Sequence, residues 1–384
     1  MAIGLAVVPD VDDVTLASVL RNALGPDAQL DGLWNGRPLH GGFGGQGLYR
    51  FDGEARTRDG VRPWSAVLKV CPPEGEDSDP GAWDAPRREA LAYGSGFLDQ
   101  LPGPLVAPRC LGLTDRPDGS VWLWLEEVVD EYPGPWGINR FVLAARHLGR
   151  SNGAFLATGT LPDHAWFSRN WLRRYIVAEG VAAATIEVPA DAPALLRQCF
   201  PPPVAFWLRE LWAERETFLS VLDRLPQTIC HHDAFRRNLF ARRRADGEEQ
   251  TVAIDWAFAG IGAVGGELTP LVQGSLGFFE VRDCAPRELT EAALAAYVTG
   301  LREAGWDGDE RLVRLGFLAT AALLYTVGTA GLTMAMIADP TEHPAYEHAM
   351  GLSMAEAVAA WVELSTFKFE LVEEARQLLP QLTI

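Results

Sequence analysis

Two short polar segments decide what this chain can be: CHHDAFRRNLF at 230–240 and TVAIDW at 251–256. The first carries two histidines, an aspartate, two arginines and an asparagine, and the apolar run FLSVLDRL lies upstream of it. Within it, Asn238 follows Asp233 by five residues, and Asp255 closes the next strand-like run. We therefore expect three oxygen-bearing side chains to converge from two neighbouring loops.

Carboxylate and amide oxygens suit a hard cation such as Mg²⁺, which keeps several waters and needs only one or two carboxylates beside substrate phosphates. Asn238 and Asp255 fit that need, and Asp233 can face an acceptor and take a proton from its hydroxyl. A loop aspartate commonly caps a turn instead. The spacing of the three residues favours the catalytic interpretation.

The order His-x-Asp-x-x-x-x-Asn, then a strand and an aspartate, is typical of the catalytic loop of the kinase fold. HHDAFRRNLF with AIDWAFAG resembles the aminoglycoside phosphotransferase and choline kinase-like family, over roughly residues 39–275. The resemblance implies a two-lobed, protein-kinase-like α+β fold. Its N-terminal lobe would be a small antiparallel sheet, and its C-terminal lobe large and mainly helical.

The resemblance also implies roles for individual residues. Asp233 would be the catalytic base, His231 would brace the catalytic loop, and Asn238 and Asp255 would hold the metal. Lys69 ends the strand-like run WSAVLKV, where the family has a lysine that contacts the α- and β-phosphates of the nucleotide. A chance survivor on a sheet face is the alternative for Lys69. Only Lys69 and Lys368 are lysines among 33 basic residues, which favours a chemical reason.

Other segments of the N-terminal half are expected to complete the nucleotide site. Glu89, in RREALAYG, would pair with Lys69, or it could be a solvated charge on a helix. Glu126 and Val128 end VWLWLEEV, which resembles the hinge strand whose backbone holds adenine.

The glycine-rich run HGGFGGQG could cradle phosphates through backbone N–H groups. A dinucleotide site would need a helix after the glycines. Here a strand-like run follows, so a hairpin that covers the nucleotide is favoured. The residues predicted to take part are Gly42, Gly44 and Gly45.

Two residues depart from the family pattern: His232, where a small residue is common, and Glu267, where an aspartate is usual. Glu267 is assigned a structural role, and His232 is either surface filler or an acceptor contact. Because adjacent residues on extended backbone point opposite ways, His231 and His232 are not expected to share a metal. A thiol-hydrolase triad of Cys230, His231 and Asp233 is disfavoured, since such groups normally meet through the fold.

The predicted lobes are residues 1–128, which include a helical extension at 1–38, and residues 129–384. Strand patterns start near residue 39 and helical patterns dominate from about 265. The predicted segments are helices over 11–25, 83–99, 139–159 and 204–225, and strands over about 39–70, 109–113 and 120–128.

The composition limits the partners and the location. Of 384 residues, 48% are hydrophobic and 22% charged, typical of a soluble globular protein. The net charge of −18 disfavours nucleic acid, whose phosphates would be repelled. No signal peptide or membrane helix is expected. Five scattered cysteines indicate reduced thiols in a cytoplasm.

The acceptor is expected to be a small molecule, and a cationic one. From residue 256 to the end the chain has 17 acidic and 7 basic residues, and the family builds its acceptor site in this half. An acidic wall would suit an amino sugar, an aminoglycoside or a quaternary amine; an acidic surface unrelated to the site is the alternative. The predicted activity is transfer of phosphate from ATP or GTP with Mg²⁺ to a hydroxyl, the alternative being a pseudokinase that binds nucleotide without turnover.

Overall fold

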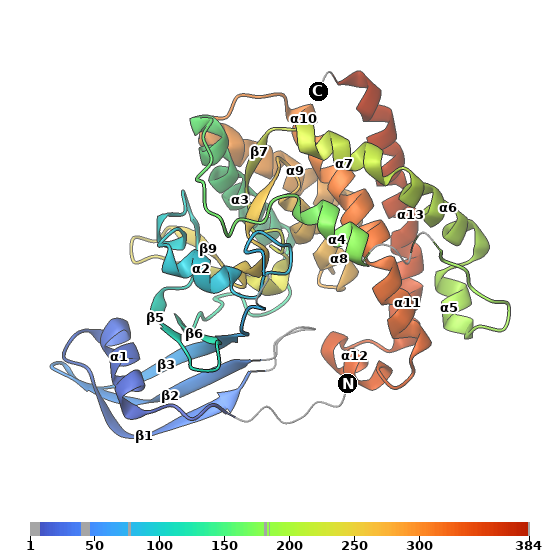
Figure 1. The fold of residues 1–384 in the computed structure, drawn as a ribbon. Helices are drawn as coiled ribbons and strands as arrows, with labels where there is room; N and C mark the ends of the chain where they lie inside the picture. Colours follow the sequence, from blue (N-terminus) through green and yellow to red (C-terminus); the bar gives the residue numbers. More distant parts are fainter. Residues whose placement is uncertain (1–7, 40–46, 76–77, 180–182, 184, 383–384) are drawn as a thin grey trace.

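The computed structural model describes residues 8–39, 47–75, 78–179, 183 and 185–382. A twisted antiparallel sheet forms the N-terminal part, and helices build most of the remainder (Figure 1). This is the predicted α+β, protein-kinase-like architecture. The sheet has the strand order β1-β2-β3-β6-β5. Its strands are β1 (Gln29–Pro38), β2 (Leu48–Thr57), β3 (Gly60–Cys71), β5 (Cys110–Asp115) and β6 (Val121–Glu126).

The sheet begins earlier than the sequence pattern indicated. Residues 29–38 form β1, which pairs with β2 from Gln29↔Arg56 to Pro38↔Tyr49, so the segment 1–38 is not wholly a helical extension. The predicted helix at 11–25 is present as α1 (Asp13–Leu24), and the Asp12 side chain caps its first turn by accepting from Thr15 N at 2.7 Å. The predicted domain boundary at 128 stays a prediction.

Strand β6 is buried on both faces, which explains its continuous apolar run. Trp122 and Trp124 face α1 and join a small outer core with Phe51 and Leu68. The alternate residues of β6 face the helical lobe and belong to the large core. The strand therefore ties the outer layer of the sheet to the body of the protein.

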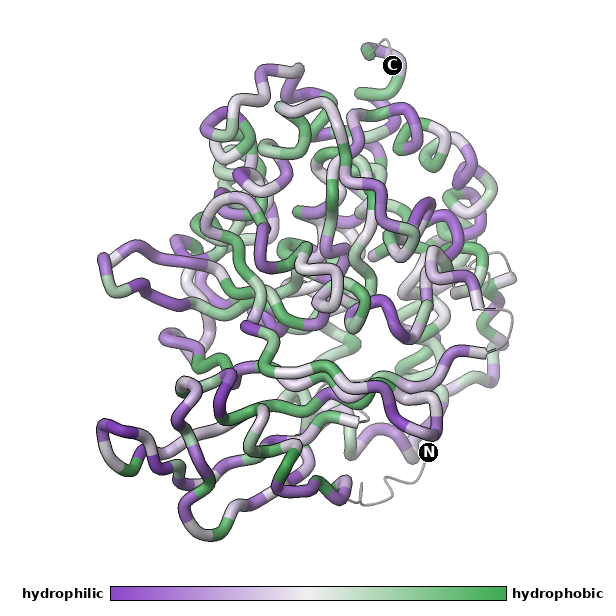
Figure 2. Tube along the Cα trace, turned by 60° about the vertical axis from the view of Figure 1, so that its left-hand side comes forward, coloured by the Kyte–Doolittle hydropathy of each residue, from purple (hydrophilic) through white to green (hydrophobic). Residues whose placement is uncertain are grey.

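The connection after β3 contains less helix than predicted. It forms α2 (Arg88–Gly94) and the 3-10 turn η1 (Leu98–Gln100) in place of one helix over 83–99. The predicted helix at 204–225 is divided in two near Glu214. Figure 2 shows hydrophobic and hydrophilic residues alternating along the helices, as amphipathic helices require. The helices of this region are α3 (Ile138–Thr158), α4 (Trp171–Glu179), α5 (Ala194–Cys199), α6 (Pro202–Ala213) and α7 (Arg215–Arg224).

Small β elements lie inside the helical lobe and carry the two polar segments. β7 (Gln227–Cys230) pairs antiparallel with β10 (Gly260–Ala263), and β9 (Glu249–Ala253) lies between β8 (Leu239–Arg243) and β4 (Leu105–Val106). The C-terminal helical elements follow. They are the π-helix η5 (Pro270–Gly274), α8 (Ser275–Gly277), α9 (Pro286–Glu303), α10 (Glu310–Thr320), the π-helix η6 (Ala321–Gly328), α11 (Ala330–Ala338), α12 (His343–Met350), α13 (Met354–Leu378) and η7 (Leu379–Gln381).

The continuous helical stretch Glu310–Ala338 is long and apolar enough to cross a membrane by length and composition. Half of its most apolar window is buried inside the protein, and α10 packs against α7 and α13. A core helix of a soluble protein passes the same test. The expected absence of a membrane segment stays a prediction.

The outer core of the sheet predicts a large loss of stability on truncation of Trp124. This side chain is 1% exposed and its ring lies 5.0 Å from that of Phe51. Trp124→Ala should lower the free energy of unfolding by about 3–5 kcal/mol, measured by urea denaturation. Leu33→Ala, at a side chain that is 94% exposed, is the control and should change it little. Equal stability of the two variants would contradict this account of the core.

Candidate active site

The pairing of β7 with β10 brings the two polar segments together. Cys230 lies opposite Gly260, and Ile254 N donates to the carbonyl oxygen of Asn238 at 2.9 Å. The first segment leaves β7 and reaches η3 (Arg236–Asn238), and the second runs from β9 into η4 (Trp256–Phe258). The loops that carry Asp233 and Asp255 therefore lie side by side.

Asn238 is oriented by the aspartate five residues before it. Its amide Nδ2 donates to Asp233 Oδ2 at 2.8 Å and to the Asp233 carbonyl oxygen at 2.9 Å. Because the amide nitrogen is engaged in this way, the amide oxygen is the atom that could ligate a cation. Asp255 has φ of 63°, a left-handed conformation that is uncommon outside glycine and that aims its side chain from the turn before η4.

His231 links the two loops. Its Nε2 donates to the carbonyl oxygen of Ile254 at 2.8 Å, and its Nδ1 accepts from Asp233 N at 3.2 Å. Burial lowers the pKa of His231 to about 4, so the ring is neutral and both contacts can be made at neutral pH. The side chain thus fixes the backbone of Asp233 against the residue that precedes Asp255.

Lys69 joins the sheet to the helical lobe. Its ammonium contacts the carboxylate of Glu89 on α2 and lies 2.6 Å from Asp255 Oδ1. Burial opposes the charge of Lys69, but the two carboxylates outweigh it and raise its pKa. Burial also opposes the charge of Asp255, yet the Lys69 ammonium holds the pKa of Asp255 below its usual range. Glu89 further accepts from Trp256 N at 3.1 Å, so one carboxylate contacts the lysine and the Asp255 turn together.

Asp233 lies in a setting that favours its protonated form. Burial raises the pKa of Asp233 to about 8, the charge of Asp255 adds to this effect, and the hydrogen bond from Asn238 opposes it. Once deprotonated, a carboxyl group with a raised pKa is a stronger base than an ordinary aspartate and can accept a proton from an alcohol.

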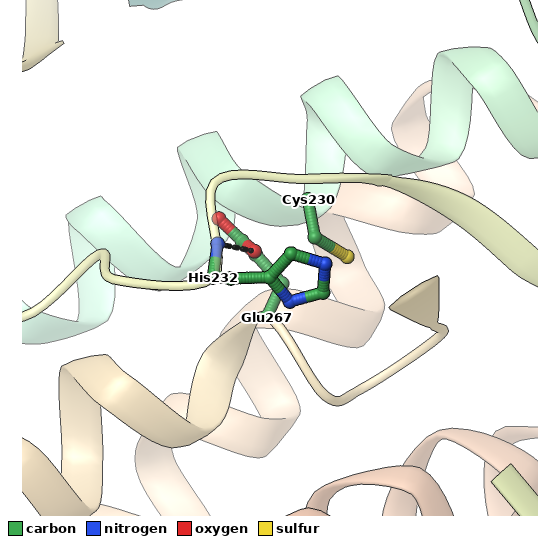
Figure 3. A group of neighbouring side chains, drawn as sticks. All are labelled: Cys230, His232 and Glu267. Atoms are coloured by element: carbon green, nitrogen blue, oxygen red, sulfur yellow. Dashed lines mark hydrogen bonds between the residues drawn. The ribbon is translucent and has the colours of Figure 1, made fainter. Parts of the chain in front are cut away.

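A second carboxylate, that of Glu267, supports the loop that carries Asp233. Glu267, in the segment between β10 and η5, accepts from His232 N at 3.2 Å (Figure 3). Ligand atoms of Cys230, His232 and Glu267 lie within 4.8 Å of one another, a donor set that could hold Zn²⁺. However, the Glu267 carboxylate already accepts from the loop backbone, and burial raises the pKa of the Cys230 thiol, which disfavours the thiolate that a metal would need. We therefore interpret the three side chains as a hydrogen-bonded support of the loop.

The side chain of His232 packs against α4. Its ring stacks on Trp171 of α4, with centroids 5.0 Å apart and planes at 10°. Burial lowers the pKa of His232 to about 3, so the ring is neutral. Trp171 stacks in turn on Tyr175 at 5.2 Å, and this row of rings anchors the catalytic loop to α4.

Of the other residues predicted to bind nucleotide, the structure describes Glu126 and Val128 but not the three glycines. Glu126 makes ion pairs with Arg109 at 2.8 Å and Arg242 at 2.7 Å, so the side chain is committed and a contact with nucleotide would have to come from the backbone. Val128 follows β6 in the connection to α3 and is partly buried. Gly42, Gly44 and Gly45 lie outside the described residues.

Arg88 is a residue that the sequence analysis missed. It is fully buried, and its guanidinium donates only to backbone carbonyl oxygens in the hydrogen bonds found among the described residues. One acceptor is Ala257, two residues after Asp255, at 2.7 Å. The others are Trp166, Trp83, Pro80 and Ala82. Arg88 thereby fixes α2, and with it Glu89, against the Asp255 turn. The only sequence signal was the pair RR before Glu89, which cannot be distinguished from a surface charge pair.

Comparison with known proteins gives a family match. The model of a phosphotransferase enzyme family, APH, matches residues 55–312. A comparison with curated proteins found no match. An aminoglycoside phosphotransferase from Alicyclobacillus acidocaldarius subsp. acidocaldarius is structurally similar over 98% of both chains, at 12% identity and a TM-score of 0.51.

Two further solved structures are similar over most of the chain. Amicoumacin kinase hAmiN, in complex with AMP-PNP, Ca²⁺ and Ami, is 15% identical over 85% of this chain and 88% of its own, with a TM-score of 0.48. Plasmodium vivax ethanolamine kinase is 10% identical over 87% of this chain and 81% of its own, with a TM-score of 0.47.

The carbonyl contacts of Arg88 predict that its loss destabilises the protein. Arg88→Met should lower the free energy of unfolding by roughly 3 kcal/mol or more, because each buried acceptor left unpaired costs about 1–3 kcal/mol. The neighbouring Arg87, which pairs with the exposed Asp115, is the matched control. Arg87→Met should cost less than about 1 kcal/mol. Similar urea midpoints for the two variants would exclude this role for Arg88.

Proposed function

The chain belongs to the phosphotransferase enzyme family, and on that premise we propose that it moves the γ-phosphate of ATP or GTP to a hydroxyl of a small cationic acceptor. The acceptor class is an amino sugar, an aminoglycoside-like molecule or a related amine-bearing metabolite. Phosphorylation of an antibiotic of this class would make the activity a resistance function, acting in the cytoplasm.

The convergence of Lys69, Asp233, Asn238 and Asp255 carries this proposal. Phosphoryl transfer asks little covalent chemistry of the protein, so positioning and charge neutralisation account for most of the catalysis. In our assignment Lys69 contacts the α- and β-phosphates, and Glu89 keeps its ammonium in place. Asp233 orients the acceptor hydroxyl and takes its proton.

The oxygen donors of Asn238 and Asp255 fit Mg²⁺. One carboxylate and one amide oxygen, together with substrate phosphates and water, make a suitable ligand set for that ion. When bound, Mg²⁺ would neutralise charge on the phosphates. The chain itself would hold these two donors close together on adjoining loops. The hydrogen bond of His231 to Ile254 and that of Asn238 to Asp233 support this arrangement.

The preference for a cationic acceptor rests on charge. The segment from residue 256 to the end has ten more acidic than basic residues, from 17 acids and 7 bases. The excess of ten already counts the pairing on α9, α10 and α13, where Arg314, one of the seven bases, contacts Glu291 and Glu374. Glu280, nearer the catalytic loop, is paired with Arg237 at 2.6 Å.

The experiment that tests the function is Mg²⁺-dependent release of ADP or GDP across a panel of acceptors. The panel contains aminoglycosides, amino sugars, neutral sugars, choline-like amines and amino alcohols. Stimulation by an amine-bearing acceptor supports the proposal. Stimulation by neutral sugars alone would refute the acceptor class, and nucleotide binding without any stimulation would favour the pseudokinase alternative.

Replacing the predicted base should impair turnover and spare nucleotide binding. Asp233→Asn keeps the size of the side chain and removes its ability to take a proton. We expect turnover with the best acceptor to fall by roughly 10²-fold or more, with the Kd for nucleotide largely unchanged. Asp163→Asn is the matched control, since Asp163 is 92% exposed and pairs only with Arg169 among the described ion pairs. Unchanged turnover in Asp233→Asn would remove this residue from the chemistry.

A further inference from the structure

The second lysine of the chain has no role in the proposed nucleotide site. Lys368, on α13, donates from Nζ to the carbonyl oxygen of Tyr325 at 2.6 Å. Among the described residues it forms no ion pair with a carboxylate, and burial lowers the pKa of Lys368 to about 8. Partial removal of an ammonium from water without a carboxylate partner is costly, so Lys368 is not explained by a gain in stability from an ion pair.

The carbonyl that Lys368 binds belongs to an unusual backbone segment. Tyr325 lies in the π-helix η6, between α10 and α11. Segments of this kind are rare and often occur at functional sites. The Tyr325 carbonyl also accepts from Thr329 Oγ1 at 3.0 Å. Two donors therefore fix the turn that carries the Tyr325 side chain.

The phenol of Tyr325 lies next to the catalytic loop. A Cβ atom built on Gly274 of η5 would lie 3.0 Å from Tyr325 Oη and 3.1 Å from Phe235 Cβ, so the hydroxyl and the loop residue approach one point. Burial raises the pKa of Tyr325 well above its usual value, and the charge of Asp233 is the next cause. The contact geometry thus places the hydroxyl beside Phe235, two residues after the predicted base Asp233 in the catalytic loop.

A row of aromatic side chains connects η6, the segment that carries Tyr325, with the catalytic loop. A Cβ atom on Gly328, at the end of η6, would lie 3.0 Å from Tyr175 Cε1. Tyr175 stacks on Trp171, which stacks on His232 of the catalytic loop, and Trp83 meets Tyr175 edge-on at 5.4 Å. The row of rings thus runs from the catalytic loop to η6.

We propose that Tyr325 is an acceptor-positioning residue, whose hydroxyl hydrogen-bonds a polar group of the acceptor beside the hydroxyl that Asp233 orients. Lys368 is a positioning residue that acts through it, by holding the π-helical turn. A phenol donates and accepts, so the recognised group is a hydroxyl or an amine adjacent to the reacting hydroxyl. This inference rests on the proposed function and specifies its acceptor.

The first test is Tyr325→Phe in the full chain, assayed with the best acceptor of the panel. We expect kcat/KM for the acceptor to fall about 3- to 10-fold, the usual effect of losing one hydrogen bond of about 0.5–1.5 kcal/mol. KM for nucleotide and nucleotide hydrolysis without acceptor should not change. Tyr132→Phe, at a side chain that is 45% exposed, is the matched control and should leave every constant unchanged.

The second test separates positioning from a merely structural role. Lys368→Met removes a costly charge and keeps the length of the side chain, so Tm should stay the same or rise. The kcat/KM for the acceptor should nevertheless fall by a factor similar to that of Tyr325→Phe. The double variant should be no worse than the poorer single variant, since both changes act on one contact.

Two failures can be told apart. If the wild type shows acceptor-stimulated turnover and Tyr325→Phe keeps the same kcat/KM, the role of Tyr325 is refuted and the proposed function stands. A lower Tm in Lys368→Met with unchanged kinetics would reduce that lysine to a structural residue. No stimulation of the wild type by any acceptor would overturn the proposed function, and this inference with it.

Discussion

The ammonium of Lys69 between the carboxylates of Glu89 and Asp255 is the contact on which the site depends. It connects three elements that are distant in sequence: the sheet strand β3, the helix α2 and the turn before η4. The attraction between these charges is strong in a largely buried setting. It offsets the hydration that the charged groups lose only when both carboxylates are well placed around the ammonium. Arg88 and the Trp256 amide supply that placement, because they hold α2 and the Asp255 turn in one position.

Three contacts support the catalytic loop. His231 ties it to Ile254, Glu267 holds the backbone of His232 from behind, and Trp171 packs on the His232 ring. These three contacts use neutral or backbone-bonded groups. The carboxyl groups of Asp233 and Asp255 can therefore face the side on which nucleotide and acceptor are proposed to meet.

The sequence predicted the features that are local, and missed those that depend on tertiary pairing. Asp233 and Asn238 precede β8 and Asp255 follows β9, so all three lie at the open end of one antiparallel hairpin and could be brought together without knowing the rest of the fold. The start of the sheet was placed ten residues too late, because β1, with the sequence QLDGLWNGRP, is an edge strand with no fully buried residue and little apolar alternation. Arg88 and Tyr325 had no local signal. Their roles depend on contacts that are distant in sequence: Arg88 donates to Trp166 and Ala257, 78 and 169 residues away, and the Tyr325 carbonyl accepts from Lys368, 43 residues away.

The near absence of lysine gives the protein an unusual response to chemical modification. Reagents directed at side-chain amines, such as active esters and aldehydes, have only Lys69 and Lys368 as targets. The first amine is held in two ion pairs, and the second is bonded to a backbone carbonyl. Positive charge on the surface is otherwise carried by guanidinium groups, which stay protonated and pair with carboxylates through two parallel bonds. Coupling at side-chain amines would therefore report on these two partly buried lysines, while the arginine side chains at the surface would stay unmodified.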